Sequence, residues 1–170
     1  DDYYRSRREF EHSPGFCQPF TDGPLNNPEN PIEAAYLQMI DSAKHILYIT
    51  TPYFIVEDAM VRALVNAAKS GVDVRIITPE IPDKKTVHFT TRSYYRPLIH
   101  DGVKIYEYKG GFMHAKTFIA DDAVATVGTV NLDFRSLYLH FECGMYFARH
   151  KKHVLMEKPL CNTERECEIL

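Results

Sequence analysis

The sequence predicts an α/β fold in which a mixed, mostly parallel β-sheet is flanked by helices. Two near-continuous apolar runs, residues 45–50 and 72–78, have the composition of strands buried on both faces. The amphipathic segment 57–70 lies between them, and such a strand–helix–strand unit implies parallel pairing with a right-handed crossover. Residues 113–120 and 123–127 add a hairpin, and hence antiparallel pairing. The pattern is that of one α/β sandwich.

The amino-terminal part of the chain is expected to enter this fold through a short strand. Residues 1–14 are charged and irregular, which indicates an exposed lead-in, and residues 15–20 have strand character. Residues 21–30 are rich in Asp, Gly, Pro and Asn, so we expect a loop there. At the other end, residues 151–170 form a polar tail that is typical of a weakly ordered terminus. The folded domain should therefore span residues 15–150.

A helix is predicted to begin at Pro31. Asn30 can act as its N-cap, Pro31 suits the first helical position, and Glu33 completes a capping-box pattern. Helical spacing gives this helix one apolar face, formed by Ile32, Ala35, Tyr36, Met39, Ile40 and Ala43. We expect that face to be buried.

Farther along the chain, Asp83 is expected to cap a third helix that runs to Ile99. Pro97 should kink that helix or end its first part, because proline lacks the backbone N–H that a helix interior needs. Residues 103–108 and 140–148 complete the predicted strands. The sheet therefore has one further strand before the hairpin and one after it.

His114 and Lys116 carry the clearest chemical signal in the chain. They are two residues apart in the predicted strand 113–120, and a strand places residues i and i+2 on the same face. The ammonium of Lys116 offers a compact positive charge for phosphate oxygens. The imidazole of His114 can serve as a nucleophile or as a general acid and base near neutral pH. The pair therefore indicates binding and attack of a phosphoryl group.

The residues that follow support the same chemistry. Asp121 marks the hairpin turn, and Gly128 opens a loop that carries Thr129 and Asn131. A backbone N–H, a hydroxyl and an amide can all donate hydrogen bonds to phosphate oxygens. We therefore expect Gly128 to bind substrate, and Thr129 and Asn131 to join the catalytic group.

These positions resemble a known signature, His-x-Lys-x4-Asp-x6-Gly-(Ser/Thr)-x-Asn, which is that of the phospholipase D superfamily. The flanking sequence is similar to the carboxy-terminal half of bacterial cardiolipin synthases, and this similarity lies in residues 51–54, 71–77, 92–95, 102–108, 131–136 and 141–142. The resemblance covers about residues 1–150. It implies half of a phospholipase D-like α/β sandwich.

The resemblance also implies a mechanism. Enzymes of this superfamily build one site from two copies of the motif, in which one His becomes a phosphohistidine and the other protonates the departing alcohol. This chain carries one copy. We therefore expect a phosphatidyltransferase half that makes cardiolipin from two phosphatidylglycerols at the cytoplasmic face of the bacterial membrane. A segment upstream of this chain, which would also hold membrane anchors, or a second copy of the chain would supply the other motif.

Further site residues follow from the resemblance and from position. The resemblance places the carboxylate of Glu142 against the motif imidazole, where it would fix the tautomer and support positive charge. Asp121, at the strand end, is expected to hold the loop. Arg92 is a candidate for contact with an anionic head group, and a helix-surface role is its alternative. Tyr53 and Phe54 are candidates to line the substrate pocket, with core packing as the alternative.

Composition narrows the remaining choices. The net charge is −3 and the pI is about 6.2, which argues against a broadly basic surface for nucleic acid. No apolar run approaches the roughly 18 residues of a membrane span. The cysteines and histidines match no standard metal-site spacing, so we expect neither a metal nor a cofactor. Two alternatives stay open, a homodimeric nuclease or phosphodiesterase of the same superfamily, and an inactive fragment or binding module.

Overall fold

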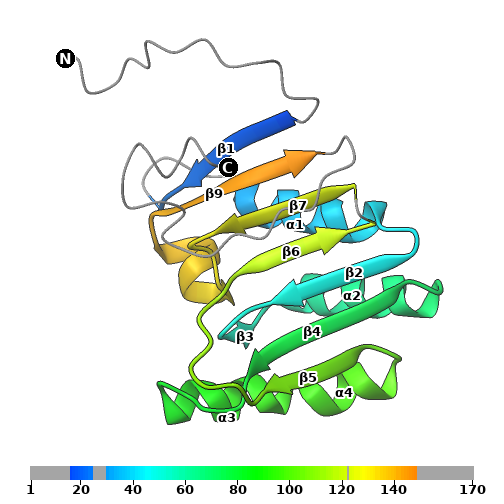
Figure 1. The fold of residues 1–170 in the computed structure, drawn as a ribbon, viewed down its shortest axis with the longest axis vertical. Coiled ribbons are helices and arrows are strands. Elements are labelled where there is room, and N and C mark those ends of the chain that lie inside the picture. The colour runs from blue at the N-terminus through cyan, green and yellow to red at the C-terminus, as the bar shows by residue number, and fades with distance from the viewer. Residues whose placement is uncertain (1–15, 25–29, 122, 149–170) are drawn as a thin grey trace.

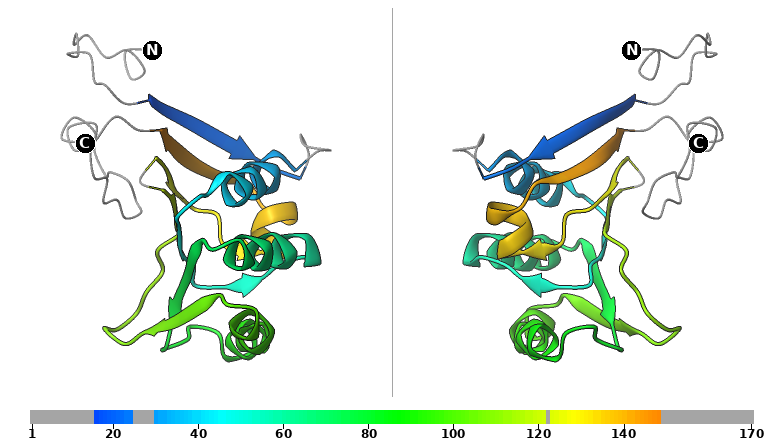
Figure 2. Two further views of the ribbon diagram at one scale, coloured as in Figure 1. Left: turned by 90° about the vertical axis from the view of Figure 1, so that its right-hand side faces the viewer. Right: turned by 90° about the vertical axis from the view of Figure 1, so that its left-hand side faces the viewer.

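The computed structural model of the chain describes residues 16–24, 30–121 and 123–148, which form two layers (Figure 1). One layer is a seven-stranded sheet, and helices form the other on a single face of that sheet (Figure 2). The strands, in their order across the sheet, are β1 (Phe16–Asp22), β9 (Glu142–Ala148), β7 (Val124–Gly128), β6 (Thr117–Ala120), β2 (Ile46–Thr50), β4 (Asp73–Pro79) and β5 (Lys104–Tyr108).

The helical layer and a second, small sheet complete the fold. The helices are α1 (Pro31–Ser42), α2 (Asp58–Lys69), α3 (Lys85–Ser93), α4 (Tyr95–His100) and a π-helix, η2 (Arg135–Leu139). The small sheet pairs β3 (Phe54–Ile55) with β8 (Leu132–Asp133). None of the helices that the structure describes is long and apolar enough to cross a membrane. The predicted lead-in of residues 1–14 and the tail of residues 151–170 lie outside the described residues.

The sheet is mixed, which confirms the predicted α/β class. Strands β2, β4 and β5 run parallel, so β2, α2 and β4 form the expected strand–helix–strand unit. Strands β6 and β7 form the expected antiparallel hairpin. The remaining strand pairs are also antiparallel, namely β2 with β6, β7 with β9, and β9 with β1. The parallel strands and the hairpin therefore share one sheet, with β2 and β6 at the junction.

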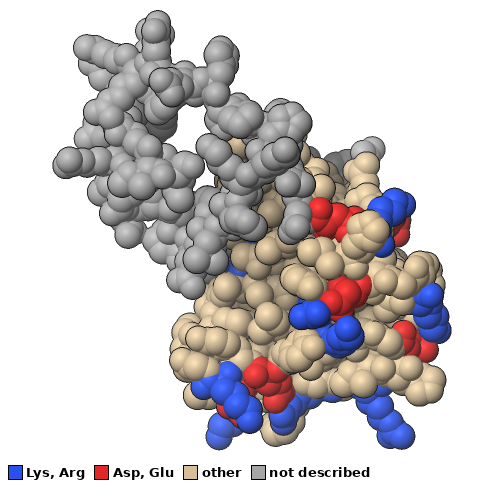
Figure 3. Space-filling view, turned by 45° about the vertical axis from the view of Figure 1, so that its right-hand side comes forward, with Lys and Arg blue, Asp and Glu red and all other residues tan. Residues whose placement is uncertain are grey.

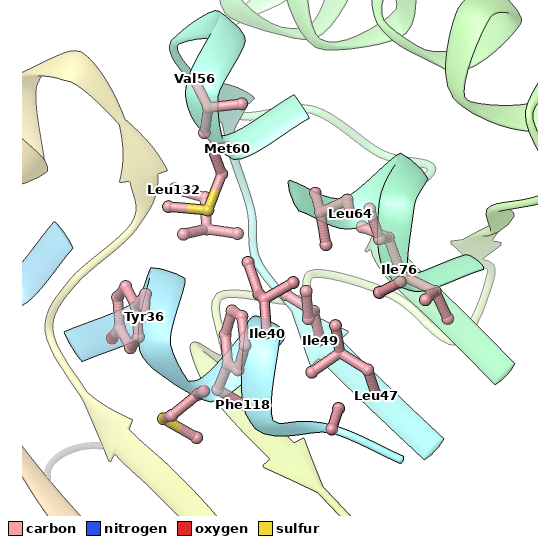
Figure 4. Packing of buried hydrophobic residues seen from close by; sticks show 14 of the residues in the cluster. Tyr36, Ile40, Leu47, Ile49, Val56, Met60, Leu64, Ile76, Phe118 and Leu132 are labelled. Carbon is pink, nitrogen blue, oxygen red and sulfur yellow. The ribbon is translucent and has the colours of Figure 1, made fainter. Parts of the chain in front are cut away.

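The core lies between the sheet and the helices (Figure 4). Leu47 and Ile49 of β2 and Val74 and Ile76 of β4 are at most 1% exposed, because alternate residues of these central strands face the helical layer. Ile40 of α1 is buried against them. Each such side chain contributes roughly 1.5–3 kcal/mol on burial. Burial of these side chains thus stabilises the central strands β2 and β4, and the candidate site lies at the carboxyl end of β2.

Helix α1 begins at Pro31 as predicted, but the prediction that the Asn30 side chain caps it is wrong. Asn30 has a left-handed backbone, with φ 45° and ψ 60°, and its side chain makes no capping hydrogen bond. A side-chain cap requires an extended backbone at that position. The carbonyl of Asn30 still accepts the first helical bond, from the N–H of Ala34 at 3.1 Å. Ala35, expected on the buried face, is exposed.

The third predicted helix is two helices. Helix α3 ends at Ser93 and α4 begins at Tyr95, which confirms the interruption expected from Pro97. Proline has no N–H to donate to the carbonyl of Ser93, four residues earlier. Asp83 does not cap α3 as expected, because its carboxylate instead accepts a hydrogen bond from the hydroxyl of Tyr53.

Strand β6 is shorter than the predicted strand 113–120, because it starts at Thr117. Thr117 pairs with Thr50, the last residue of β2. Beyond that point the chain turns toward β4, where the N–H of Thr51 donates to the carbonyl of Ile77 at 3.1 Å. Residues 113–116 therefore have no strand partner on this side and take an irregular path.

The helix-free face of the sheet is visible in Figure 3, where charged residues occur in small mixed groups on a mainly uncharged surface. On β4 and β5, Asp73 accepts hydrogen bonds from Arg75 at 2.9 and 2.6 Å and from Lys104 at 2.8 Å. The hydrogen bonds from Arg75 and then Lys104 hold the pKa of Asp73 well below its usual range. In this part of the surface, positive charge is therefore locally neutralised.

Candidate active site

The motif segments meet at the edge of the sheet where β2 and β7 end and β6 and β9 begin (Figure 1, left). Thr117 of β6 pairs with Thr50 of β2 on one side and with Val127 of β7 on the other. The irregular segment 112–116 therefore lies beside the loop 128–131. The strand register thus brings two sequence-distant parts of the motif together.

Lys116 and His114 are in direct contact at this edge. The Nζ atom of Lys116 lies 3.1 Å from Nδ1 of His114 and donates to the carbonyl oxygen of the same residue at 2.7 Å. Lys116 is only 5% exposed, so its ammonium is held within the protein. The structure thus brings the predicted pair together, although through an irregular segment rather than a strand. Their roles in a reaction stay a prediction.

Gly128 and Thr129 join the motif loop to β9. A Cβ atom on Gly128 would lie 2.4 Å from the carbonyl oxygen of Cys143, so this close approach of β7 and β9 requires glycine. The hydroxyl of Thr129 donates to the carboxylate of Glu142 and accepts from the N–H of Cys143 at 3.1 Å. Glu142 is 7% exposed, and its other oxygen lies 3.5 Å from Nδ1 of His140. The expected action of Glu142 on His114 stays a prediction.

Asn131 is held by the turn that leads into η2. Its Nδ2 donates to the hydroxyl oxygen of Ser136 at 3.0 Å, and its Oδ1 is buried with no hydrogen-bond partner among the described residues. The N–H of Ser136 in turn donates to Asp133 at 2.7 Å. A π-helical turn is uncommon and often marks a functional site. The expected hydrogen bond from Asn131 to a phosphate oxygen stays a prediction.

Asp121 lies at the opposite end of β6 from Lys116. Its carboxylate accepts backbone N–H bonds from Lys44 at 2.5 Å, His45 at 2.7 Å and Ile46 at 2.8 Å. Burial raises the pKa of Asp121, but the bonds from Ile46, Lys44 and His45 outweigh it, so the pKa is lowered from its ordinary 3.8. Asp121 therefore ties the hairpin turn to the start of β2, away from the other motif residues.

Tyr53 lies against the motif histidine. Its ring meets the ring of His114 edge-on, with centroids 6.1 Å apart and planes at 76°. The hydroxyl donates to Asp83, and Nζ of Lys84 lies 5.7 Å from the ring centroid. Burial, followed by the hydrogen bond and charge of Asp83, raises the pKa of Tyr53 well above its usual value. Tyr53 therefore keeps its proton as a hydrogen-bond donor.

Two other expected substrate contacts lie elsewhere. Phe54 is 1% exposed and packs edge-on against Tyr94 at 5.5 Å, so it is a core residue and does not line the pocket. Arg92 on α3 forms a two-pronged ion pair with Glu107 of β5, at 2.7 and 2.8 Å. This pair raises the pKa of Arg92. Contact between Arg92 and an anionic head group stays a prediction.

Sequence reasoning missed two features of this edge. Phe112 stacks on His114, with centroids 5.7 Å apart and planes at 13°, and the only signal in the sequence was an aromatic residue two positions before the histidine. A pocket of about 510 Å³ lies beside the Thr129–Glu142 pair. Its lining is Thr21, Asp22, Gly23, Pro31, Thr129, Phe141, Glu142 and Cys143. The pocket depends on β1 pairing with β9, which no local pattern reveals.

The charges at this edge suit a phosphodiester. Lys116 supplies one positive group and Arg135 another, and Nε of Arg135 donates to Nε2 of His140 at 3.0 Å. Within residues 16–24, 30–121 and 123–148, no three His, Cys, Asp or Glu side chains are grouped to hold a metal ion. Ammonium, guanidinium and imidazole groups can bind phosphate oxygens and move protons.

The chain matches known proteins over most of its length. Residues 36–158 match the family model described as the phospholipase D-like domain of cardiolipin synthase. Cardiolipin synthase 2 of Bacillus anthracis is 46% identical over 138 residues, which are 81% of this chain and 26% of that protein. The cardiolipin synthase of Clostridium perfringens is 41% identical over 151 residues, or 89% of this chain and 32% of that protein. The chain thus spans between a quarter and a third of these relatives.

A solved structure shows the same fold. Nuc from Salmonella typhimurium, described as a phospholipase D family member, aligns with a TM-score of 0.63 at 22% identity. The alignment covers 79% of this chain and 83% of Nuc. At this level of identity the likeness concerns the fold alone.

Proposed function

Because the chain belongs to the family of phospholipase D-like domains of cardiolipin synthases, we propose that it is one motif-bearing half of a phosphatidyltransferase. Two phosphatidylglycerols are its substrates, and cardiolipin and glycerol are the products. The observation that carries this proposal is the contact between Lys116 and His114, 3.1 Å apart at the edge that also holds the loop 128–131. Family membership supports the reaction type, and that contact supports the site.

The positive groups are proposed to hold the phosphodiester and its transition state. The five-coordinate phosphorus has more negative charge on its equatorial oxygens than the substrate has, so fixed donors stabilise it selectively. Lys116 offers the nearest fixed charge to His114, and the amide of Asn131 and the loop at Gly128 supply neutral donors. Removal of one such donor typically costs about 10²–10³-fold in rate.

The reaction needs two imidazoles. In the first step one imidazole nitrogen bonds to phosphorus, the bond from phosphorus to the glycerol oxygen breaks, and the second imidazole gives its proton to that oxygen. In the second step a hydroxyl of the other phosphatidylglycerol bonds to phosphorus, the phosphorus–nitrogen bond breaks, and the second imidazole takes the hydroxyl proton. A single imidazole cannot attack in line and also protonate the opposite apex. His114 is one of the two.

The contact with Lys116 is compatible with either role of His114. An ammonium donates hydrogen bonds and cannot accept them, so a neutral His114 accepts at Nδ1 and carries its proton on Nε2. A general acid starts as the imidazolium, and a nucleophile presents an unprotonated nitrogen to phosphorus, so each role requires a proton to move from this state. Experiment must decide which imidazole is the nucleophile.

The second motif is proposed to come from the part of a longer polypeptide that this chain does not span. The chain covers 26% of the Bacillus anthracis relative, which leaves room for another motif-bearing half. The site would then work at the cytoplasmic face of a bacterial membrane, where phosphatidylglycerol lies. The alternative arrangement is that two copies of this chain complete one site.

A chimera tests the proposed function. This chain would replace the matching 138-residue stretch of the Bacillus anthracis enzyme, and cardiolipin formed from phosphatidylglycerol vesicles would be measured by mass spectrometry. The chimera should make cardiolipin, and His114→Ala within it should lower the rate by about 10⁴-fold or more. His88→Ala, a histidine on α3, serves as the matched control and should leave the rate unchanged.

The same chimera tests the role of His114. A phosphatidyl ester of p-nitrophenol has a leaving group that departs without a proton. With this substrate a burst of p-nitrophenol from His114→Ala would make His114 the proton donor, because the nucleophile would then be intact. If His114→Ala abolishes the burst while His88→Ala does not, His114 is the nucleophile. Retention of a tenth of the cardiolipin synthesis by His114→Ala would exclude both roles.

A further inference from the structure

The imidazole of His114 is close to two aromatic rings that no motif assigns to it. Phe112 stacks on the imidazole, with centroids 5.7 Å apart, and Tyr53 meets the same ring edge-on at 6.1 Å. We propose that Phe112 and Tyr53 are positioning residues that clamp His114 in its reactive orientation, and that Asp83 fixes Tyr53. This inference rests on the proposed function, because it assigns a purpose to the orientation of that imidazole.

The location of His114 explains the need for a clamp. Histidine 114 precedes β6, in a segment without strand pairing, so the sheet does not fix its backbone directly. An imidazole turns about two side-chain bonds, and a displacement of about 1 Å at a reacting group can cost on the order of 100-fold in rate. Contacts on the ring itself must therefore supply the precision that a strand would otherwise give.

Phe112 has little to do with the hydrophobic core. Its side chain is 65% exposed, so burial contributes little to its placement. Its ring is nearly parallel to that of His114, at 13°, an offset stacked arrangement that aromatic pairs favour. A large exposed apolar side chain beside a reactive histidine is more readily explained by action on the histidine than by stability of the fold.

Tyr53 is anchored at both of its ends. Its backbone carbonyl accepts a hydrogen bond from the hydroxyl of Thr51 at 2.8 Å, and its own hydroxyl donates to Asp83. Its side chain is 9% exposed, in contrast to Phe112. Asp83 belongs to the connection between β4 and α3, so the anchor joins that connection to the motif. Tyr53 is therefore the anchored member of the clamp, and Phe112 is the exposed member.

Nuclear magnetic resonance of the 170-residue chain tests the clamp without any need for activity. Phe112→Leu keeps an apolar side chain but removes the ring, and Phe112→Tyr keeps the ring. Phe89→Leu is the matched control, because Phe89 is 70% exposed and lies beside His88 with centroids 6.5 Å apart. The ring protons of His114, and their nuclear Overhauser contacts to Tyr53, are observed in each variant.

In Phe112→Leu the His114 ring protons should move downfield, as the ring current is lost, and their contacts to Tyr53 should weaken. Phe112→Tyr should restore both signals. Tyr53→Phe and Asp83→Asn should each weaken the same contacts. The double variant, with both substitutions, should weaken them no further than either single substitution does, because both remove the same hydrogen bond. If Phe112→Leu and Phe89→Leu leave His114 equally unchanged, the clamp does not exist.

Kinetics in the chimera then show whether the clamp serves the reaction. Phe112→Leu should lower kcat by about tenfold with KM unchanged, because positioning affects the reacting state rather than substrate binding. Phe112→Tyr should recover most of the rate. If the wild-type chimera is inactive, the proposed function fails, while the resonance data on the isolated chain still decide the clamp. An active chimera in which Phe112→Leu raises only KM would make Phe112 a substrate contact and overturn its positioning role.

Discussion

Lys116 and His114 lie 3.1 Å apart, Nζ to Nδ1, although neither residue belongs to a strand. The carbonyl of His114 accepts a second bond from the same ammonium at 2.7 Å, so Lys116 folds back on the segment that carries the histidine. This buried ammonium places a positive charge beside His114 and leaves Nδ1 of a neutral His114 as a hydrogen-bond acceptor.

Lys116→Arg should not preserve activity in the chimera. The side chain is 5% exposed, and a guanidinium is broader and planar, so it cannot take the place of an ammonium beside Nδ1. We expect a loss of about 10²-fold or more in kcat/KM. Lys104→Arg, at an exposed lysine of β5, provides the control for the substitution itself. A near-normal rate in Lys116→Arg would mean that only long-range charge matters there.

Chelation should leave cardiolipin synthesis by the chimera intact. Lys116, His114 and Asn131 are proposed to supply the positive charge and hydrogen bonds that a divalent ion supplies in other phosphoryl-transfer sites. The rate would be compared before and after dialysis against EDTA. Loss of activity that a single divalent ion restores would refute this view of the site.

Glu142→Gln should slow the reaction by roughly 10²-fold, less than His114→Ala does. Glutamine keeps the shape and can still accept from Thr129, but it removes a buried negative charge beside His140. The pH–rate profile of the chimera would be compared with that of Glu107→Gln, which alters a carboxylate paired with Arg92. Identical profiles for Glu142→Gln and wild type would exclude an electrostatic role for Glu142.

Asp121→Asn should destabilise the chain by about 1–2 kcal/mol at neutral pH, from weaker acceptance of three backbone N–H groups. Asparagine tolerates the left-handed backbone, φ 54°, so the change reports mainly on charge. Because the folded-state pKa is lowered, the contribution is present above the ordinary 3.8 and is lost as pH falls through the folded value.

Urea unfolding of Asp121→Asn at several pH values measures this effect. The difference from wild type should be largest near neutrality and should shrink in acid. Asp41→Asn, at an exposed carboxylate of α1, should show no such trend. If the difference in unfolding free energy between Asp121→Asn and wild type is independent of pH, the charge of Asp121 does not stabilise the fold.

The sequence was sufficient for the elements whose signal is local. The buried runs of β2 and β4 and the amphipathic face of α2 were recognised, because alternation and helical spacing reflect burial directly. The proximity of Lys116 and His114 was also predicted, but from a strand that begins only at Thr117. In a strand, residues two positions apart lie on the same face. Here the two side chains meet because the ammonium of Lys116 folds back to the backbone carbonyl of His114.

Features that depend on distant residues were not predictable in this way. The pairing of β1 with β9 joins residues more than a hundred positions apart. The bond from Tyr53 to Asp83 spans 30 positions, and Asp83 had been expected to cap a helix. Asn30 had the right residue type for a cap but the wrong backbone conformation. In each case tertiary contacts, rather than local preference, determine what the side chain does.

The most direct test of the two-motif account is cardiolipin formation by the 170-residue chain alone. The chain, shown to be monomeric by sedimentation, would be incubated with phosphatidylglycerol vesicles beside the chimera at equal concentration, and cardiolipin quantified by mass spectrometry. The account predicts product from the chimera and none from the monomer, because the monomer carries one motif imidazole where two are needed. Sustained turnover by the monomer would contradict it.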